Sequence, residues 1–215
     1  MLNRFGFALL AAVLVVTTGS VVSAQERVRL GKFTDFSGEA KVKEVGETGS
    51  YVQLQDTWIN QSVYKGDQLL TGEDSHVEIT IESTKVELFS NSHALLDKTS
   101  EGLYVVNVTR GRVTAYIETD VFQLRVRNQV VYGKNTAVTV TIEPNNDIII
   151  KAVRGAIYVE NEYGATIVIP EEQSVVINYD RLRRNYVFRP DSRNIDDFAV
   201  LPKGATEPIL VATDK

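Results

Sequence analysis

Residues 64–96, YKGDQLLTGEDSHVEITIESTKVELFSNSHALL, carry the clearest periodic pattern in this chain of 215 residues. A period of two is typical of a β-strand with one buried face. Gly66 and Gly72 stand beside polar residues, which indicates turns. The stretch therefore predicts short strands joined by turns. The apolar residues at alternate positions are Val77, Ile79, Ile81, Val86 and Leu88.

The same alternation continues through residues 38–179, in about a dozen runs spaced about 8 to 12 residues apart. No convincing amphipathic helix separates these runs, so we predict an all-β domain over this range. Glycines recur between the runs, which favours a stacked, solenoid-like architecture. Periodicity alone does not choose between that arrangement and a sandwich, so both stay open.

The N-terminal segment has the organisation of a secretory signal peptide. Arg4 supplies a positive charge, an apolar stretch follows, and small residues end at Ala24. We expect cleavage after Ala24 and an exported, periplasmic or extracellular chain. The alternative is an uncleaved anchor, but the apolar stretch is shorter than the roughly 20 residues that a spanning helix needs. Residues 25–37 are polar with weak alternation, and we predict a leader into the domain.

The composition excludes several classes of protein. The formal net charge of −5 is opposite to that of a non-specific nucleic-acid binder. The chain has no cysteine, which excludes thiol catalysis, thiolate metal sites and a lipid-modified cysteine. No later segment is long and apolar enough to cross a bilayer.

Residues 180–215 differ from the rest by their basic side chains and weak strand pattern. We predict an irregular extension with one short helix over residues 192–201. The arginines could bind an acidic partner or an anionic envelope polymer. Alternatively, their charge protects a solvated edge strand from pairing. The candidate partner-binding residues are Arg181, Arg183, Arg184 and Arg189.

A series of short motifs resembles the FecR domain. They occur in the order and spacing of that family over residues 38–179: Trp58, Gly66-Asp67, Thr71-Gly72, Asp74-Ser75 and Asn91-Ser92, followed by strand–glycine–strand elements at Gly111 and Gly155. The sequence departs from the family at Glu82-Ser83-Thr84, where an Asp-Gly-Ser turn is usual.

The resemblance implies a function in the bacterial cell envelope. FecR-like regulators typically join a cytoplasmic sigma-binding tail, one membrane helix and a periplasmic domain that receives a signal. Here only a few residues precede the apolar stretch. We therefore expect a stand-alone exported module that binds, assembles with or receives a signal from an envelope protein or polymer. Neither catalysis nor a cofactor is expected.

Candidate chemistry is sparse. The two histidines, His76 and His93, lack the close pairing with a carboxylate that a cupin-like metal site needs. No Gly-x-Ser-x-Gly elbow or phosphate loop is present. Acidic pairs such as Glu118 and Asp120 are compatible with turns as well as with a glycosidase. We predict no metal site and no enzyme.

Aromatic residues offer an alternative function. Trp58, with Tyr51 and Tyr64 nearby in sequence, could form a platform on which a polysaccharide stacks. The family position of Trp58 favours a buried structural aromatic instead.

Overall fold

The computed structural model describes residues 27–45, 50–180, 185–190, 199–201 and 209–210. The predicted signal peptide lies outside these ranges. Within them the regular structure consists of nineteen strands and one short 3₁₀ helix, η1 (Asp56–Trp58). No helix in these ranges has the length and apolarity that crossing a membrane requires. The all-β prediction is confirmed.

The strands form two sheets that share one long strand, β9 (Tyr104–Ile117). Sheet A has the order β4 (Ser62–Tyr64), β1 (Arg29–Ser37), β6 (His76–Ile81), β7 (Thr84–Leu88), the second half of β9, β12 (Thr136–Ile142), β13 (Ile148–Arg154), β16 (Ser174–Asp180) and β17 (Asn185–Pro190).

Sheet B has the order β3 (Val52–Gln53), β2 (Ala40–Lys43), β5 (Gln68–Thr71), β8 (His93–Lys98), the first half of β9, β10 (Phe122–Val126), β11 (Gln129–Tyr132), β14 (Ile157–Glu160), β15 (Thr166–Ile169), β18 (Ala199–Leu201) and β19 (Ile209–Leu210).

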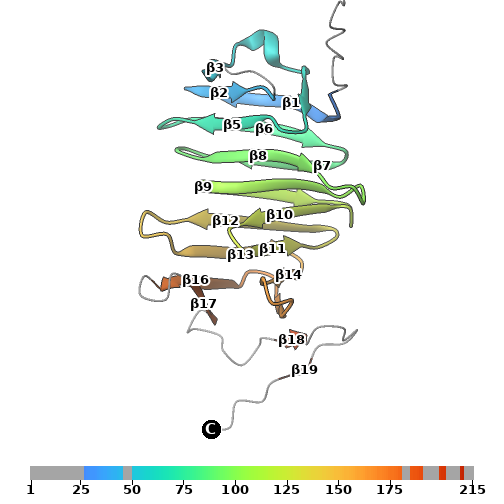
Figure 1. The fold of residues 1–215 in the computed structure, drawn as a ribbon, viewed down its shortest axis with the longest axis vertical. Coiled ribbons are helices and arrows are strands. Elements are labelled where there is room, and N and C mark those ends of the chain that lie inside the picture. Colours follow the sequence, from blue (N-terminus) through green and yellow to red (C-terminus); the bar gives the residue numbers. More distant parts are fainter. Residues whose placement is uncertain (1–26, 46–49, 181–184, 191–198, 202–208, 211–215) are drawn as a thin grey trace, which may run out of the picture.

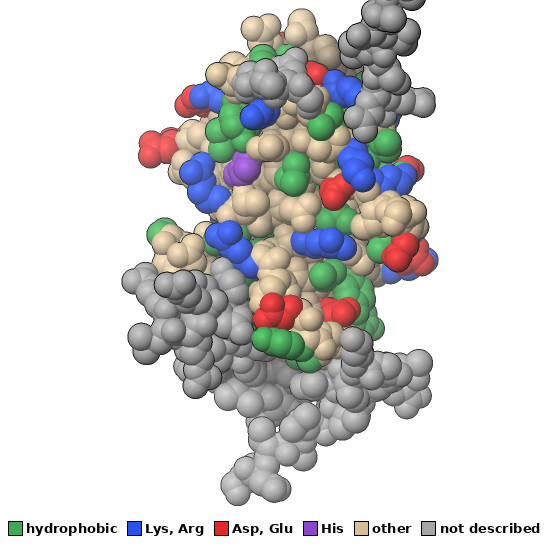
Figure 2. Space-filling view, viewed as in Figure 1, with side chains coloured by type: hydrophobic (Ala, Val, Ile, Leu, Met, Phe, Trp, Pro, Cys, Tyr) green, Lys and Arg blue, Asp and Glu red, His purple; other side chains and the backbone are tan. Residues whose placement is uncertain are grey.

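The strands lie one above another along the long axis of the molecule (Figure 1). Pairing is antiparallel except between β9 and β10, which run parallel. The inward side chains of both sheets form one continuous apolar core, which includes the fully buried rings of Phe33 and Phe122. The arrangement is that of a sandwich whose interior is filled by side chains. Its outer faces carry the polar residues of the alternating pattern, with basic and acidic side chains interspersed on the face in Figure 2.

Glycines with a left-handed backbone mark corners where the chain passes from one sheet to the other. Gly38 (φ +69°) lies between β1 and β2, and Gly111 (φ +79°) lies in the middle of β9. Each faces a serine hydroxyl, Ser75 or Ser92, whose oxygen accepts the N–H of the residue after the glycine. A Cβ would lie 2.6 Å from Ser75 Oγ at the first corner and 2.5 Å from Ser92 Oγ at the second. Both corners therefore need a residue without a side chain.

Several of the motifs that resemble the FecR family form these corners, namely Asp74-Ser75, Asn91-Ser92 and the glycines at 111 and 155. Asp74 (φ 49°) and Asn91 (φ 57°) adopt the left-handed conformation directly before the two serines. Asn135 (φ 55°) repeats the arrangement before Thr136, whose Cγ2 would lie 3.2 Å from a Cβ on Gly155. Asn and Asp tolerate this conformation better than other residues with side chains. These motifs are thus explained by the architecture of the sandwich.

The segment expected as a leader is largely strand β1. Residues 31–37 pair with β6, and Leu30 and Phe33 are buried in the core. A register shift between Phe33 and Asp35 interrupts the alternation. Such a bulge places an extra residue in the strand, and this is why the periodicity in the sequence is weak.

The sheets also continue past the expected end of the domain at residue 179. Strand β17 pairs with β16, and β18 and β19 extend sheet B. The expected irregular extension is wrong for these strands. Residues 199–201 form β18 and not the end of the predicted helix, while residues 191–198 lie outside the described ranges.

Candidate binding recess on the outer face of sheet B

A small recess opens on the outer face of sheet B, where side chains from three strands and one preceding segment converge. Leu70 of β5 is the cross-strand partner of His93 of β8, which in turn is the partner of Arg110 of β9. Tyr51, just before β3, completes the lining. The recess has a volume of about 240 Å³. We call these four residues the sheet B recess.

Hydrogen bonds fix the histidine at the base of the recess. Its Nε2 lies 2.9 Å from the Tyr51 hydroxyl, and its Nδ1 lies 2.5 Å from Thr109 Oγ1. The Tyr51 hydroxyl also lies 2.8 Å from Gln68 Oε1. Because a tyrosine hydroxyl has one proton, it can donate either to Gln68 or to His93, but not to both. The protonation state of His93 is therefore coupled to the orientation of its neighbours.

Arg110 makes the recess electropositive. Its Nε donates to the Asn91 carbonyl oxygen at 3.1 Å, and within the described ranges no carboxylate forms a salt bridge with its guanidinium. Burial, together with the positive charge of Arg110, lowers the pKa of His93. Burial raises the pKa of Tyr51, and the charge of Arg110 opposes that shift. The recess thus combines an exposed cation, a neutral imidazole, a phenol and an aliphatic side chain.

The lowered pKa of His93 predicts a loss of stability in mild acid. Below the ordinary histidine pKa of about 6.5, the unfolded chain binds a proton that the folded protein resists. The free energy of unfolding should therefore fall as the pH drops below about 6.5 towards the folded-state pKa of His93. Above about pH 6.5, His93 should make no pH-dependent contribution.

Urea unfolding at about pH 7.5 and about pH 5 checks this, with His93→Gln expected to reduce the acid-induced loss. The matched control is His76→Gln, which leaves His93 in place and should therefore retain the acid-induced loss of stability. An acid-induced loss as large in His93→Gln as in the wild type would contradict the assignment.

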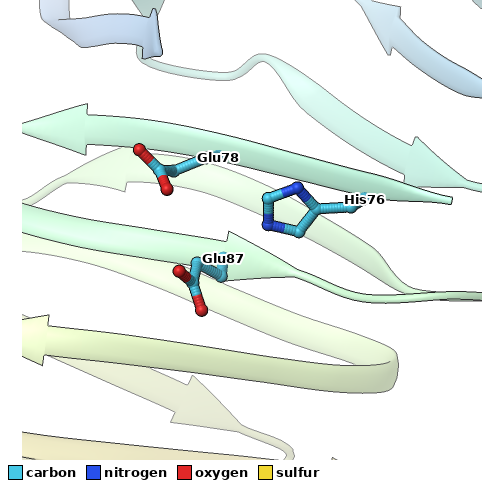
Figure 3. Close-up of side chains that lie close together, drawn as sticks. All are labelled: His76, Glu78 and Glu87. Carbon is cyan, nitrogen blue, oxygen red and sulfur yellow. The ribbon is translucent and has the colours of Figure 1, made fainter. Parts of the chain in front are cut away.

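A second polar cluster lies on the outer face of sheet A (Figure 3). His76 and Glu78 come from β6 and Glu87 from β7, and their possible ligand atoms lie within 4.8 Å of one another. Glu78 and Glu87 are direct cross-strand partners. Lys85 Nζ pairs with both carboxylates, at 3.2 Å to Glu78 and 2.6 Å to Glu87. Lysine thus already supplies the cation that two facing carboxylates need.

The cluster shows a closer histidine–carboxylate grouping than the sequence predicted. The grouping depends on the β6–β7 register, which the sequence alone did not specify. Thr34 Oγ1 also donates to Glu78 Oε1 at 2.8 Å, so that carboxylate has a second protein partner. A metal ion would have to displace Lys85, so the arrangement favours a cross-strand ion-pair cluster that joins β6 and β7.

The three candidate glycan-stacking residues have separate partners. The Trp58 ring packs edge-on against Phe33, with ring centroids 5.8 Å apart, and it lies half-buried against the core. Tyr64 lies beneath the Arg27 guanidinium at 4.1 Å. Tyr51 meets His93. Among the described residues no ring contact joins any two of the three, so the structure gives no support for a shared platform.

The candidate partner-binding arginines are mostly beyond the described structure. Arg181, Arg183 and Arg184 lie outside it. Arg189 belongs to β17, where its backbone is the register partner of Val176. The role of these arginines stays a prediction.

Sequence reasoning missed Arg110 and His93. Arg110 belongs to no motif that the sequence singles out, and His93 entered the sequence analysis only as a candidate metal ligand. The sequence does contain a clue to their proximity. If the strand that follows Asn91-Ser92 pairs with the strand that precedes Gly111, His93 and Arg110 lie at the same corner, as the structure shows. Tyr51 could not be placed beside them, because it lies 42 positions away from His93 in sequence.

Comparison with known proteins gives a link at the level of the fold only. No protein-family model and no curated protein matches the chain. Two crystal structures of a "putative anti-sigma factor" from Parabacteroides distasonis ATCC 8503 are similar. The one at 1.65 Å has a TM-score of 0.46 and 14% identity, and the one at 2.50 Å has 0.48 and 12%. Each match covers 58% of this chain and 59% of the other, so the chain spans less than two thirds of those proteins, and the similarity is coarse.

Proposed function

We propose that the chain is an exported, non-catalytic binding module of FecR-like type, which binds or assembles with another component of the bacterial cell envelope. Export is inferred from the signal-peptide pattern, and the FecR-like type from the motifs that form the corners of the sandwich. The sheet B recess carries the proposal of binding, because an exposed arginine stands there beside Tyr51 and Leu70. Arginine and tyrosine are enriched among the residues that dominate the energy of protein interfaces.

Arg110 forms no salt bridge within the described residues, unlike two basic side chains on the outer face of sheet A. Lys85 is held by Glu78 and Glu87, and Arg154 by Glu118. Arg110 contacts only a backbone carbonyl oxygen among the interactions described. Its two terminal amino groups are therefore available to a partner, and they stand beside the apolar and aromatic lining of the recess.

The alternative of polysaccharide binding has less support. A stacking platform needs open aromatic faces, whereas Trp58 packs on Phe33 and Arg27 covers Tyr64.

A pull-down from envelope extract tests the proposal, with the full chain as bait. We expect a specific partner to be captured by the wild type and lost, by at least about tenfold in affinity, with Arg110→Glu. Arg112→Glu is the matched control: Arg112 lies two positions further along β9 and packs over the Phe89 ring at 4.3 Å.

Two results would count against the proposal in different ways. Capture of the same partner by Arg110→Glu would move the contact surface away from the recess. Failure of the wild type to capture any specific partner would contradict a binding function.

A further inference from the structure

We infer that the sheet B recess receives a carboxylate from a protein partner, namely an aspartate or glutamate side chain on an exposed segment. The inference rests on the proposed binding function and specifies its chemistry.

The guanidinium of Arg110 determines the charge of the ligand. Its Nε donates a hydrogen bond to the Asn91 carbonyl oxygen at 3.1 Å, which fixes one side of the planar group. The exposed terminal amino groups then present parallel N–H donors, and this fork matches the two oxygens of a carboxylate. Because no acidic side chain of the described residues pairs with Arg110, its charge is free to attract an acidic group from a partner.

A bound carboxylate would also change the protonation of His93, which lies beside Arg110. His93 contacts Tyr51 and the uncharged Thr109, lies next to the charged Arg110, and is separated by Tyr51 from the uncharged Gln68. Lys41 of β2 lies one strand beyond, as the partner of Leu70, and is ion-paired with Glu39. A carboxylate between Arg110 and His93 would offset the positive charge of Arg110 and make the imidazolium more favourable. Binding should therefore take up protons and become tighter as the pH falls towards 6.

The size of the recess favours one side chain over a larger ligand. Its volume of about 240 Å³ is below the roughly 300 to 1,000 Å³ of sites for drug-sized molecules. Leu70 and the Tyr51 ring provide apolar contacts for the methylene groups of an acidic side chain. The Tyr51 and His93 rings meet at 75° with centroids 6.2 Å apart, so Tyr51 is engaged with His93 and favours a side chain over a stacked sugar.

Nuclear magnetic resonance of the histidine ring signals tests the inference on the full chain. His76→Gln leaves His93 as the only histidine and assigns its signal. The probes are two short capped peptides, Gly-Glu-Gly and Gly-Gln-Gly, together with glucuronate. We expect the glutamate peptide to shift the His93 signal in a saturable way with millimolar affinity, and the His93 pKa to rise in its presence.

Two variants in this background locate the contact. Arg110→Gln should weaken binding of the glutamate peptide at least about tenfold, and Arg112→Gln should leave it unchanged. The glutamine peptide should produce no more than about a tenth of the effect.

Three outcomes would overturn the inference. The glutamine peptide could act as well as the glutamate peptide, or neither could shift His93 at concentrations up to about 20 mM. Glucuronate alone could bind, which would assign the recess to an acidic sugar. If a partner is nevertheless captured through Arg110 in the pull-down, the binding function stands and only the carboxylate chemistry fails.

Discussion

Gly111→Ala should lower the free energy of unfolding by about 3 kcal/mol, through backbone strain and a steric clash together. Gly111 has φ +79°, and its new Cβ would lie 2.5 Å from Ser92 Oγ and 2.6 Å from the Asn91 carbonyl oxygen. These atoms belong to the corner that turns β9 from sheet B into sheet A, so they cannot move without disturbing both sheets.

Gly102→Ala separates the two contributions. Gly102 also has a left-handed backbone, at φ +92°, but a Cβ there would meet no atom within 4 Å. Its substitution should cost about 1 kcal/mol, from backbone strain alone. Urea unfolding of the three proteins measures the difference. Equal losses in the two variants would show that Ser92 does not pack against Gly111 as described.

Asp67→Ala should be destabilising to a similar extent, by about 2 to 4 kcal/mol. Asp67 is only 2% exposed. It accepts the backbone N–H groups of Tyr64 at 2.8 Å and Val45 at 3.2 Å, and it pairs with Arg27 at 2.9 Å. Burial raises the pKa of this carboxyl, while these three partners act in the opposite direction. Removal of the carboxylate would leave three donors without their acceptor.

Asp67→Asn and Asp120→Ala are the controls for this prediction, again by urea unfolding. Asparagine keeps an acceptor oxygen for the backbone groups and should cost less than alanine. Asp120 forms an exposed pair with Lys134 at 3.5 Å, and its loss should change stability by less than about 0.5 kcal/mol. A cost for Asp67→Ala no larger than that for Asp120→Ala would contradict the buried role of Asp67.

The sequence predicted the parts of the fold that depend on local pattern. Alternation from Val77 to Ile81 identified strand β6, and the strand–glycine–strand pattern at Gly111 identified a break where the structure has a corner. Strand β1 was missed, because the bulge after Phe33 breaks the alternation on which the prediction relies. Strand β18 was missed because its partner is β15, and such non-local pairing leaves no local mark in the sequence. Strand β17 forms a hairpin with β16, and it was missed because the basic composition after residue 180 favoured an irregular extension.

The candidate site was predicted only in part for the same reason. Tyr51 was identified as an aromatic of interest, but in the company of Trp58 and Tyr64, its neighbours in sequence. The structure places it with His93 and Arg110, because the order of strands in sheet B brings β5, β8 and β9 together. Chemistry assembled across a sheet depends on register, and register is specified by the whole sandwich.

Site-specific photo-crosslinking in intact cells tests most directly whether sheet B contacts the partner. A photoreactive residue at Lys41, the cross-strand neighbour of Leu70 on the outer face of sheet B, should yield a specific adduct that disappears with Arg110→Glu. The same residue at Thr141, on the outer face of sheet A, should yield none. The absence of an adduct from Lys41, whether or not Thr141 yields one, would contradict binding through the sheet B recess.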